Sequence, residues 1–264
     1  MGLLLCGRRA EHPFYYEKLD TNIWSIQELS YVIVHYPIII PRDFVDRKLT
    51  NWIRDELHMG VLASRLEQYM GSGEGTDIET RLLLMILRDA NYYKETEIVA
   101  FEAGYRRLRN VDKKDFLELL GDTFFRMERY GRAIEAYEDA LRNGALDRVK
   151  QKLGAGYVSV MQFRKASDIF EESFVETNKT EPLRKLYFIH KLEPSVNTIE
   201  KYENSIDTEV LAGWEKEYNA VLKQAESSDR MEKVTELYDT EREEFRRQAK
   251  LLLLKWKKEY RDRV

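Results

Sequence analysis

Residues 120–140 read LGDTFFRMERYGRAIEAYEDA, and residues 153–173 read LGAGYVSVMQFRKASDIFEES. Each stretch has Leu-Gly, an aromatic residue three positions after the glycine, an alanine nine positions further on, a second aromatic residue four positions later and a small residue three positions after that. The two copies lie 33 residues apart. A fixed period of this length predicts a stack of repeated helix pairs. The alternative is an ordinary helical bundle in which the spacing is a coincidence.

The small residues of the pattern have a packing role. Gly121 and Gly154 leave a flat spot on the first helix of each pair, where the second helix can approach. Ala133 and Ala166 give the second helix a matching small face. The space beside this contact is filled by the aromatic residues Phe124, Tyr137, Tyr157 and Phe170. A single helix pair cannot cover its own apolar face, so neighbouring pairs must stack.

This spacing resembles the tetratricopeptide repeat (TPR), a helix-turn-helix unit of about 34 residues. Two clear TPR-like repeats lie near 114–180. A degenerate repeat at 81–113 keeps Ala100 but has Arg88 where the pattern has glycine. The chain departs from the family at the frequent tryptophan and late proline positions, which here hold Leu117, Ala145, Lys150 and Asn178.

The resemblance implies a concave groove, lined by the first helix of each pair, that binds a peptide or helix of another protein. Carried onto this chain, the groove positions are Met85, Asp89, Tyr92, Glu118, Asp122, Phe125, Gln151, Ala155 and Val158. Glu118 and Asp122 would repel a carboxylate, so the C-terminal-carboxylate clamp known in part of the family is disfavoured. Acidic and aromatic side chains suit a partner with basic and apolar residues. The alternative is that Glu118 and Asp122 are only a solvated face.

The composition favours an all-α protein in a reducing compartment. The 264-residue chain is 34% charged and has only 13 glycines and 5 prolines, so turns are few and helices long. The net charge of −4 gives no basic field for nucleic acid, and none is expected as a partner. No apolar run reaches the roughly 18 residues of a membrane span. Cys6 is the only cysteine, so no intrachain disulfide can form, which favours the cytoplasm.

The glycine-rich stretch 71–75 predicts the main domain boundary. It is not a phosphate-binding loop, because Thr76-Asp77 follows where such a loop needs Gly-Lys-Ser/Thr. The expected domains are a mainly helical one at 1–76, TPR-like repeats at 77–194 and C-terminal capping helices at 195–264. Within the first domain, residues 1–24 are expected to be irregular. Ser25 and Glu28 then form a capping box that starts a helix.

The C-terminal region predicts two long helices, at 210–224 and 230–261. The second segment contains no glycine or proline, and the first contains only Gly213. The end of the second helix is basic, with Leu251–Leu254 and Trp256 beside the charges. One interpretation is a terminal helix that packs on the repeats. The alternatives are contact with a partner or a second copy of the chain, and contact with an acidic membrane surface.

No catalytic, metal-binding or cofactor-binding pattern is present. The four histidines lack paired helical spacing, and no His-Glu-x-x-His motif occurs. The sequence therefore predicts a non-catalytic adaptor or scaffold that binds an unidentified protein. The alternative is a peptide-responsive transcriptional regulator with a helix-turn-helix-like segment at 43–70. Its second helix would offer DNA only Ser64, Arg65 and Gln68.

Overall fold

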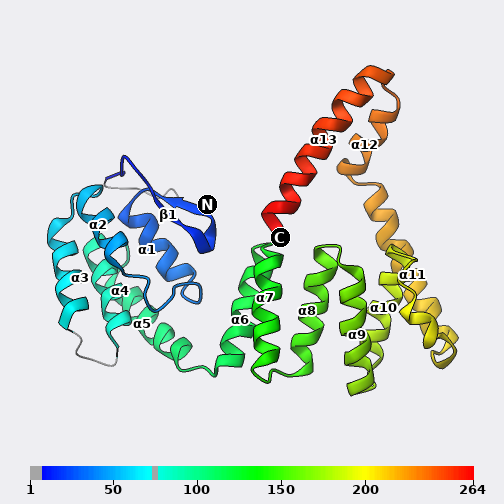
Figure 1. Ribbon diagram of the computed structural model, residues 1–264, viewed down its shortest axis with the longest axis horizontal. Helices are drawn as coiled ribbons and strands as arrows, with labels where there is room; N and C mark the ends of the chain where they lie inside the picture. Colours follow the sequence, from blue (N-terminus) through cyan, green and yellow to red (C-terminus); the bar gives the residue numbers. More distant parts are fainter. Residues whose placement is uncertain (1–7, 73–76) are drawn as a thin grey trace. The chain divides into compact units, whose positions relative to one another are not determined.

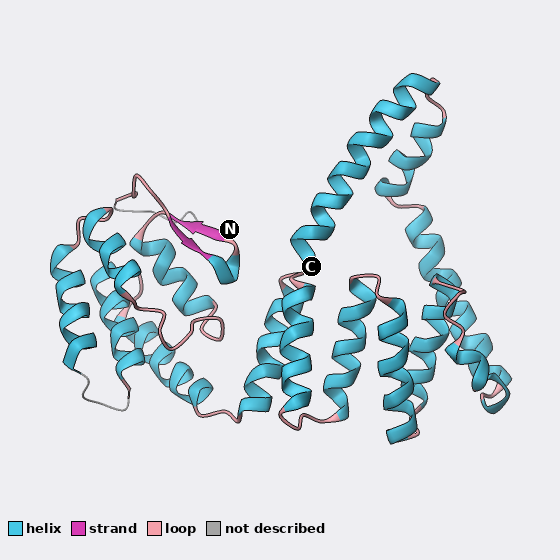
Figure 2. Ribbon diagram, viewed as in Figure 1, coloured by secondary structure: helices cyan, strands magenta, loops and turns pink. Residues whose placement is uncertain are grey.

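The computed structural model of the protein describes residues 8–72 and 77–264 (Figure 1). These residues form an all-α helical repeat fold with one two-stranded sheet, as Figure 2 shows. Two compact units are present, Met1–Asp112 and Lys113–Val264. Residues 77–112, which the sequence analysis groups with the repeats, lie in the first unit. Cys6 and the glycine-rich residues 73–75 lie outside the described residues.

The first element that the structure describes is a hairpin that the sequence analysis missed. Strand β1 (Phe14–Tyr16) pairs antiparallel with β2 (Thr21–Ile23), with Phe14 opposite Ile23, and a short 3-10 helix, η1 (Glu17–Leu19), forms the connection. The expectation of an irregular segment is therefore wrong. The burial of β1 alternates, because Phe14 and Tyr16 are buried while Tyr15 is exposed. Three residues are too few for this period to stand out in the sequence.

Five helices complete the first unit: α1 (Ile26–His35), α2 (Arg47–Asp55), α3 (Gly60–Ser72), α4 (Ile78–Ala90) and α5 (Glu95–Arg109). The cap of α1 is as predicted at Ser25, whose Oγ accepts from the Glu28 amide at 3.1 Å. The Glu28 carboxylate, however, accepts from the amide of Trp24, one residue before the expected position. The core of this unit includes Leu29, Ile33, Leu49, Ile53, Leu62, Ile86 and Leu87.

The second unit begins with five helices that pack in series: α6 (Lys113–Arg126), α7 (Tyr130–Arg142), α8 (Asp147–Ser159), α9 (Phe163–Thr177) and α10 (Thr180–Leu192). The close approach predicted at the two glycines is confirmed. A Cβ on Gly121 would lie 2.4 Å from the Tyr137 ring, and one on Gly154 would lie 2.4 Å from the Phe170 ring. Each glycine thus admits an aromatic ring from the following helix.

After α10, two short 3-10 helices separate the series of packed helices from the next α-helix. Two 3-10 helices, η2 (Thr198–Lys201) and η3 (Glu203–Ser205), precede α11 (Thr208–Glu226). The η2 residue Ile199 is buried, and the hydroxyl of Ser167 on α9 donates to the Thr198 hydroxyl at 2.7 Å. The 3-10 helix η2 therefore packs against α10 and bonds to α9, and no full helix follows α10 directly.

The long terminal helix predicted at 230–261 is wrong, because the structure breaks it into α12 (Asp229–Tyr238) and α13 (Arg242–Arg263). At the break, the Thr240 hydroxyl donates to the Leu237 carbonyl at 2.7 Å. Threonine can satisfy the end of a helix in this way without glycine or proline. The break lets α13 fold back along α12, where the rings of Tyr238 and Phe245 meet at 5.4 Å.

Candidate protein-binding groove

The predicted groove positions divide between the two units. Glu118, Asp122 and Phe125 lie on α6, and Gln151, Ala155 and Val158 lie on α8, the first helices of two successive pairs. These six residues are on one continuous series of packed helices. The remaining three predicted positions, Met85, Asp89 and Tyr92, lie in the first unit.

In the first unit, Met85 and Asp89 belong to α4, and Tyr92 follows its end. Asp89 accepts an ion pair from Arg65 of α3 at 3.1 Å. Met85 is half-buried, whereas Tyr92 is 37% exposed and its ring contacts that of Tyr93 at 4.8 Å. In this unit, one predicted groove residue thus already joins α4 to α3.

The acidic residues of α6 are paired within the chain. Glu118 is only 7% exposed, and the Arg148 guanidinium donates to both of its carboxylate oxygens at 2.8–3.0 Å. Lys152 lies 2.8 Å from Glu118 and 2.6 Å from Asp122. Hydrogen bonds from Arg148 lower the pKa of Glu118 to about 2. These two carboxylates therefore hold α8 against α6, and the negative surface expected from them is largely neutralised.

Asp122 has a second partner inside its own helix pair. The hydroxyl of Tyr137 on α7 donates to the Asp122 carboxylate at 2.9 Å. Burial, and then this bond to a carboxylate, raise the pKa of Tyr137 above its usual value. Asp122 thus links α6 to both α7 and α8, and its role is at least partly structural.

Sequence reasoning missed Arg148 and Lys152. They bond to residues 30 or 34 positions earlier, which is close to the repeat period. Stacked repeats place residues about one period apart on neighbouring helices. A search for opposite charges at this offset would have found both cations beside Glu118 and Asp122.

The apolar residues at the predicted groove positions are partly accessible. Phe125, Ala155 and Val158 are half-buried, and the Phe125 ring meets that of Tyr130 at 5.1 Å. Gln151 donates its amide to the Ser173 hydroxyl, which in turn donates to Asp147 at 2.6 Å. Because the serine proton goes to the carboxylate, the amide nitrogen of Gln151 must face the serine. The Gln151 oxygen is then a buried acceptor without a partner among the described residues.

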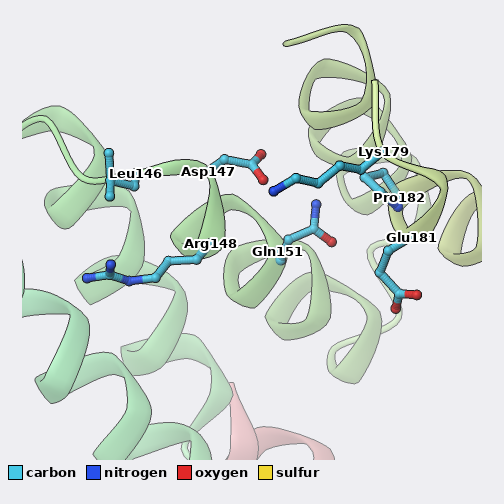
Figure 3. Close-up of a pocket in the computed structure, with 7 residues that line it drawn as sticks. All are labelled: Leu146, Asp147, Arg148, Gln151, Lys179, Glu181 and Pro182. Atoms are coloured by element: carbon cyan, nitrogen blue, oxygen red, sulfur yellow. The ribbon is translucent and has the colours of Figure 1, made fainter. Parts of the chain in front are cut away.

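A hollow of about 470 Å³ lies where α8 and α10 begin, next to Gln151. Its lining consists of Leu146, Asp147, Arg148, Gln151, Lys179, Glu181 and Pro182. Figure 3 shows the side chains of Asp147, Gln151 and Lys179 directed toward one another, while that of Arg148 points away from them. Apart from Gln151, these residues were not predicted, because they lie before or in the first turns of the two helices.

The same spacing places three more residues at groove positions on α10. Moving 33 residues on from Gln151, Ala155 and Val158 leads to Arg184, Phe188 and Lys191. All three contact α11. Their partners on α11 are, in order, Glu217 in an ion pair, Tyr218 in a ring stack at 6.4 Å and Glu215 in an ion pair at 2.7 Å. A helix of the chain itself therefore covers the positions on α10 that correspond by spacing to the predicted groove.

The helix-turn-helix-like segment 43–70 is packed within the first unit. Its second helix, α3, packs on α2 and α4. Arg65 is the only cation of α3 in the part of the chain that the structure describes, and it is paired with Asp89. A DNA-reading helix needs basic or amide side chains directed outward. No observation here favours such a role.

Within residues 8–72 and 77–264, no cluster of three or more His, Cys, Asp or Glu side chains could hold a metal ion. In the same residues, no helix is both long and apolar enough to span a membrane. Comparison with known proteins finds no matching family model, no matching curated protein and no matching solved structure.

Proposed function

We propose that this chain is a non-catalytic, cytoplasmic scaffold whose TPR-like hairpins bind a peptide or helix of another protein. The observation that carries the proposal is the position of α11. It lies on Arg184, Phe188 and Lys191, the residues of α10 that correspond by spacing to the groove positions of α8. This contact between α11 and α10 supports the proposal, because it holds a helix against the α10 members of this series of positions.

The contacts of α11 indicate how a partner would bind. Its aromatic Trp214 is 7% exposed and lies against the Tyr187 ring at 5.7 Å. The α10 residues Arg184 and Lys191, which precede and follow Tyr187, form ion pairs with α11. A helix that places apolar anchors in a groove is a common mode of peptide recognition. One fully buried large apolar side chain stabilises such a contact by about 1.5–3 kcal/mol.

The corresponding positions on α6 and α8 offer partly exposed apolar surface. Phe125, Ala155 and Val158 are half-buried, and Leu146 at the edge of the hollow is 63% exposed. Because Glu118 and Asp122 are already paired with Arg148 and Lys152, the partner has no need of a basic segment. We therefore propose a partner with apolar anchors, and preformed helices would reduce the ordering cost of binding it.

The test is site-specific photo-crosslinking in the cells from which the chain comes. Benzoylphenylalanine replaces Val158 in the groove or, as a matched control, Val175 on α9, which is 69% exposed. We expect a reproducible adduct from position 158 that is absent from position 175. The further substitution Ala155→Arg, which fills the groove, should abolish the adduct while helicity stays unchanged. The same adducts from both positions, or an adduct that persists with Ala155→Arg, would contradict the proposal.

A further inference from the structure

The last two helices have no buried residue of their own. None of the side chains of α12 or α13 is fully buried, although α13 is 22 residues long. Leu251, Leu253 and Leu254 are 61%, 51% and 54% exposed. The inner face of α13, which includes Phe245, Leu252 and Trp256, is half-buried. A helix with leucine on several sides normally has a covering partner on each apolar side.

The outward face of α13 combines leucine with positive charge. Helical spacing of four and three residues aligns five exposed side chains, here called the basic stripe: Arg247, Leu251, Leu254, Lys258 and Arg261. Lys258 and Arg261, like the neighbouring Lys250, have no ion-pair partner among the described residues. The basic stripe therefore exposes both apolar surface and unpaired charge.

The junction of α11 and α12 also exposes apolar side chains, but its charges are negative. Val221 and Leu222 are 60% and 41% exposed, beyond the part of α11 that contacts α10. They are followed by the exposed acids Glu226, Asp229 and Glu232, none of which has an ion-pair partner in the described ranges. These five residues are called the acidic junction below.

The charges of the two segments mirror each other. Residues 208–241 contain nine acidic and four basic side chains, a net charge of −5, whereas residues 242–263 contain four acidic and nine basic side chains, a net charge of +5. Within one chain, α13 lies beside α12 (Figure 1) and already uses its inner face there. Arg230 of α12 pairs with Glu259 at 2.5 Å and lies over the Trp256 ring. Its basic stripe faces away from that contact.

We infer that the basic stripe packs on the acidic junction of a second copy of this chain. The contact is reciprocal in a two-fold symmetric dimer, so it forms twice, and the basic stripe and the acidic junction of each copy are both covered. Opposite charges around the apolar contact would set the register and orientation of the two copies. The proposal is independent of the groove on α6 and α8, because it uses residues on other helices.

The experiment measures the mass of the full chain by light scattering over a range of concentrations. We expect the wild type to form a dimer of twice 31.4 kDa that weakens as salt is raised. Lys250→Glu with Lys258→Glu should weaken dimerisation at least about tenfold, and so should Glu226→Lys with Glu232→Lys. All four side chains are exposed, so helicity should not change.

The decisive step is to mix the two charge-reversed proteins. Two copies of the same variant carry like charges on the stripe and the junction, so they should repel each other. In the mixture, the stripe of each variant meets a junction of opposite charge on the other variant, so a one-to-one heterodimer should form. A wild type that stays monomeric at every concentration would overturn the inference. So would reversed proteins that dimerise as well as the wild type, or a mixture that does not associate. Binding of a monomeric wild type to phosphatidylglycerol vesicles would assign the stripe to a membrane instead.

Discussion

The helices α6–α10 and the helices α11–α13 are built from similar amphipathic segments, but only the first set has a core. In α7, the side chains of Ala133, Tyr137 and Ala140 are at most 2% exposed, whereas in α11–α13 only Trp214 is buried. The difference lies in where the small residues fall. Gly121 and Gly154 face an aromatic ring, while Gly213 of α11 has nothing near it. Helical periodicity predicts a helix, and small residues at matched positions predict what packs on it.

The largest effect that separates the two regions should come from removing one aromatic side chain in each. Phe170 is 1% exposed and Tyr238 is 74% exposed. We expect Phe170→Ala to lower the free energy of unfolding by about 3–5 kcal/mol, because a cavity remains in a core that cannot collapse. Tyr238→Ala should change it by less than about 0.5 kcal/mol. Urea titrations of both proteins measure this, and equal losses would show that the tail shares the core.

The second comparison adds a methyl group to one glycine in each region. In Gly154→Ala the new Cβ meets the buried Phe170 ring, so the free energy of unfolding should fall by about 1–3 kcal/mol. In Gly213→Ala the methyl meets open space, and the better helix propensity of alanine should raise stability by up to about 1 kcal/mol. Thermal melts followed by circular dichroism give both signs. A neutral Gly154→Ala would refute the packing role of the glycine.

The third comparison concerns pH. The pKa of Glu118 is lowered in the folded chain from 4.5 to about 2 by its bonds to Arg148. Its stabilisation is therefore present above pH 4.5 and is lost as the pH falls toward 2, by an amount on the order of 1–3 kcal/mol. Glu118→Gln should lower stability at neutral pH and flatten this acid dependence.

The control for this pH effect is Glu172→Gln. Glu172 is 54% exposed and pairs with Lys150, so its removal should cost less than about 0.5 kcal/mol. Urea titrations at several pH values between neutral and acidic test the pair. Identical acid dependence in Glu118→Gln and the wild type would mean that the buried pair does not stabilise the repeats.

Much of the repeat region was predictable because its residues act locally and at a fixed period. The sequence predicted the helix pairs and the close approach at Gly121 and Gly154, and both are confirmed. The roles of the groove positions stay predictions. The pairing of Glu118 with Arg148 and Lys152 was missed because it joins successive repeats, and only stacking makes such partners neighbours.

The hairpin, the break in the terminal helix and the contact of α11 with α10 were less predictable, because only weak local signals or long-range contacts determine them. The hairpin at β1 and β2 has three residues in each strand, and the break between α12 and α13 is marked only by a hydrogen bond from the Thr240 hydroxyl to the Leu237 carbonyl. Neither segment contains the glycine or proline that marks a turn most clearly. The covering of α10 by α11 is a long-range contact, which propensity and periodicity do not encode.

The smallest effect should come from a glycine where the two regions meet. A Cβ on Gly131 of α7 would lie 1.7 Å from the backbone oxygen of Val264, a closer clash than at Gly154. The neighbour here is the end of α13, held by a bond from Arg129 to the Asp262 carbonyl and an ion pair between Arg263 and Glu128. Because no side chain of α13 is buried, we expect this end to move away from the added methyl group.

Gly131→Ala should therefore change the free energy of unfolding by less than about 0.5 kcal/mol, since helix propensity offsets the lost contacts. Hydrogen exchange in residues 254–264 should become faster, while exchange in α8 and α9 stays as in the wild type. A loss of stability as large as that of Gly154→Ala would place the end of α13 in the core of the second unit. An added methyl group would then lower the free energy of unfolding equally in both regions. The difference in packing between α6–α10 and α11–α13 would be contradicted.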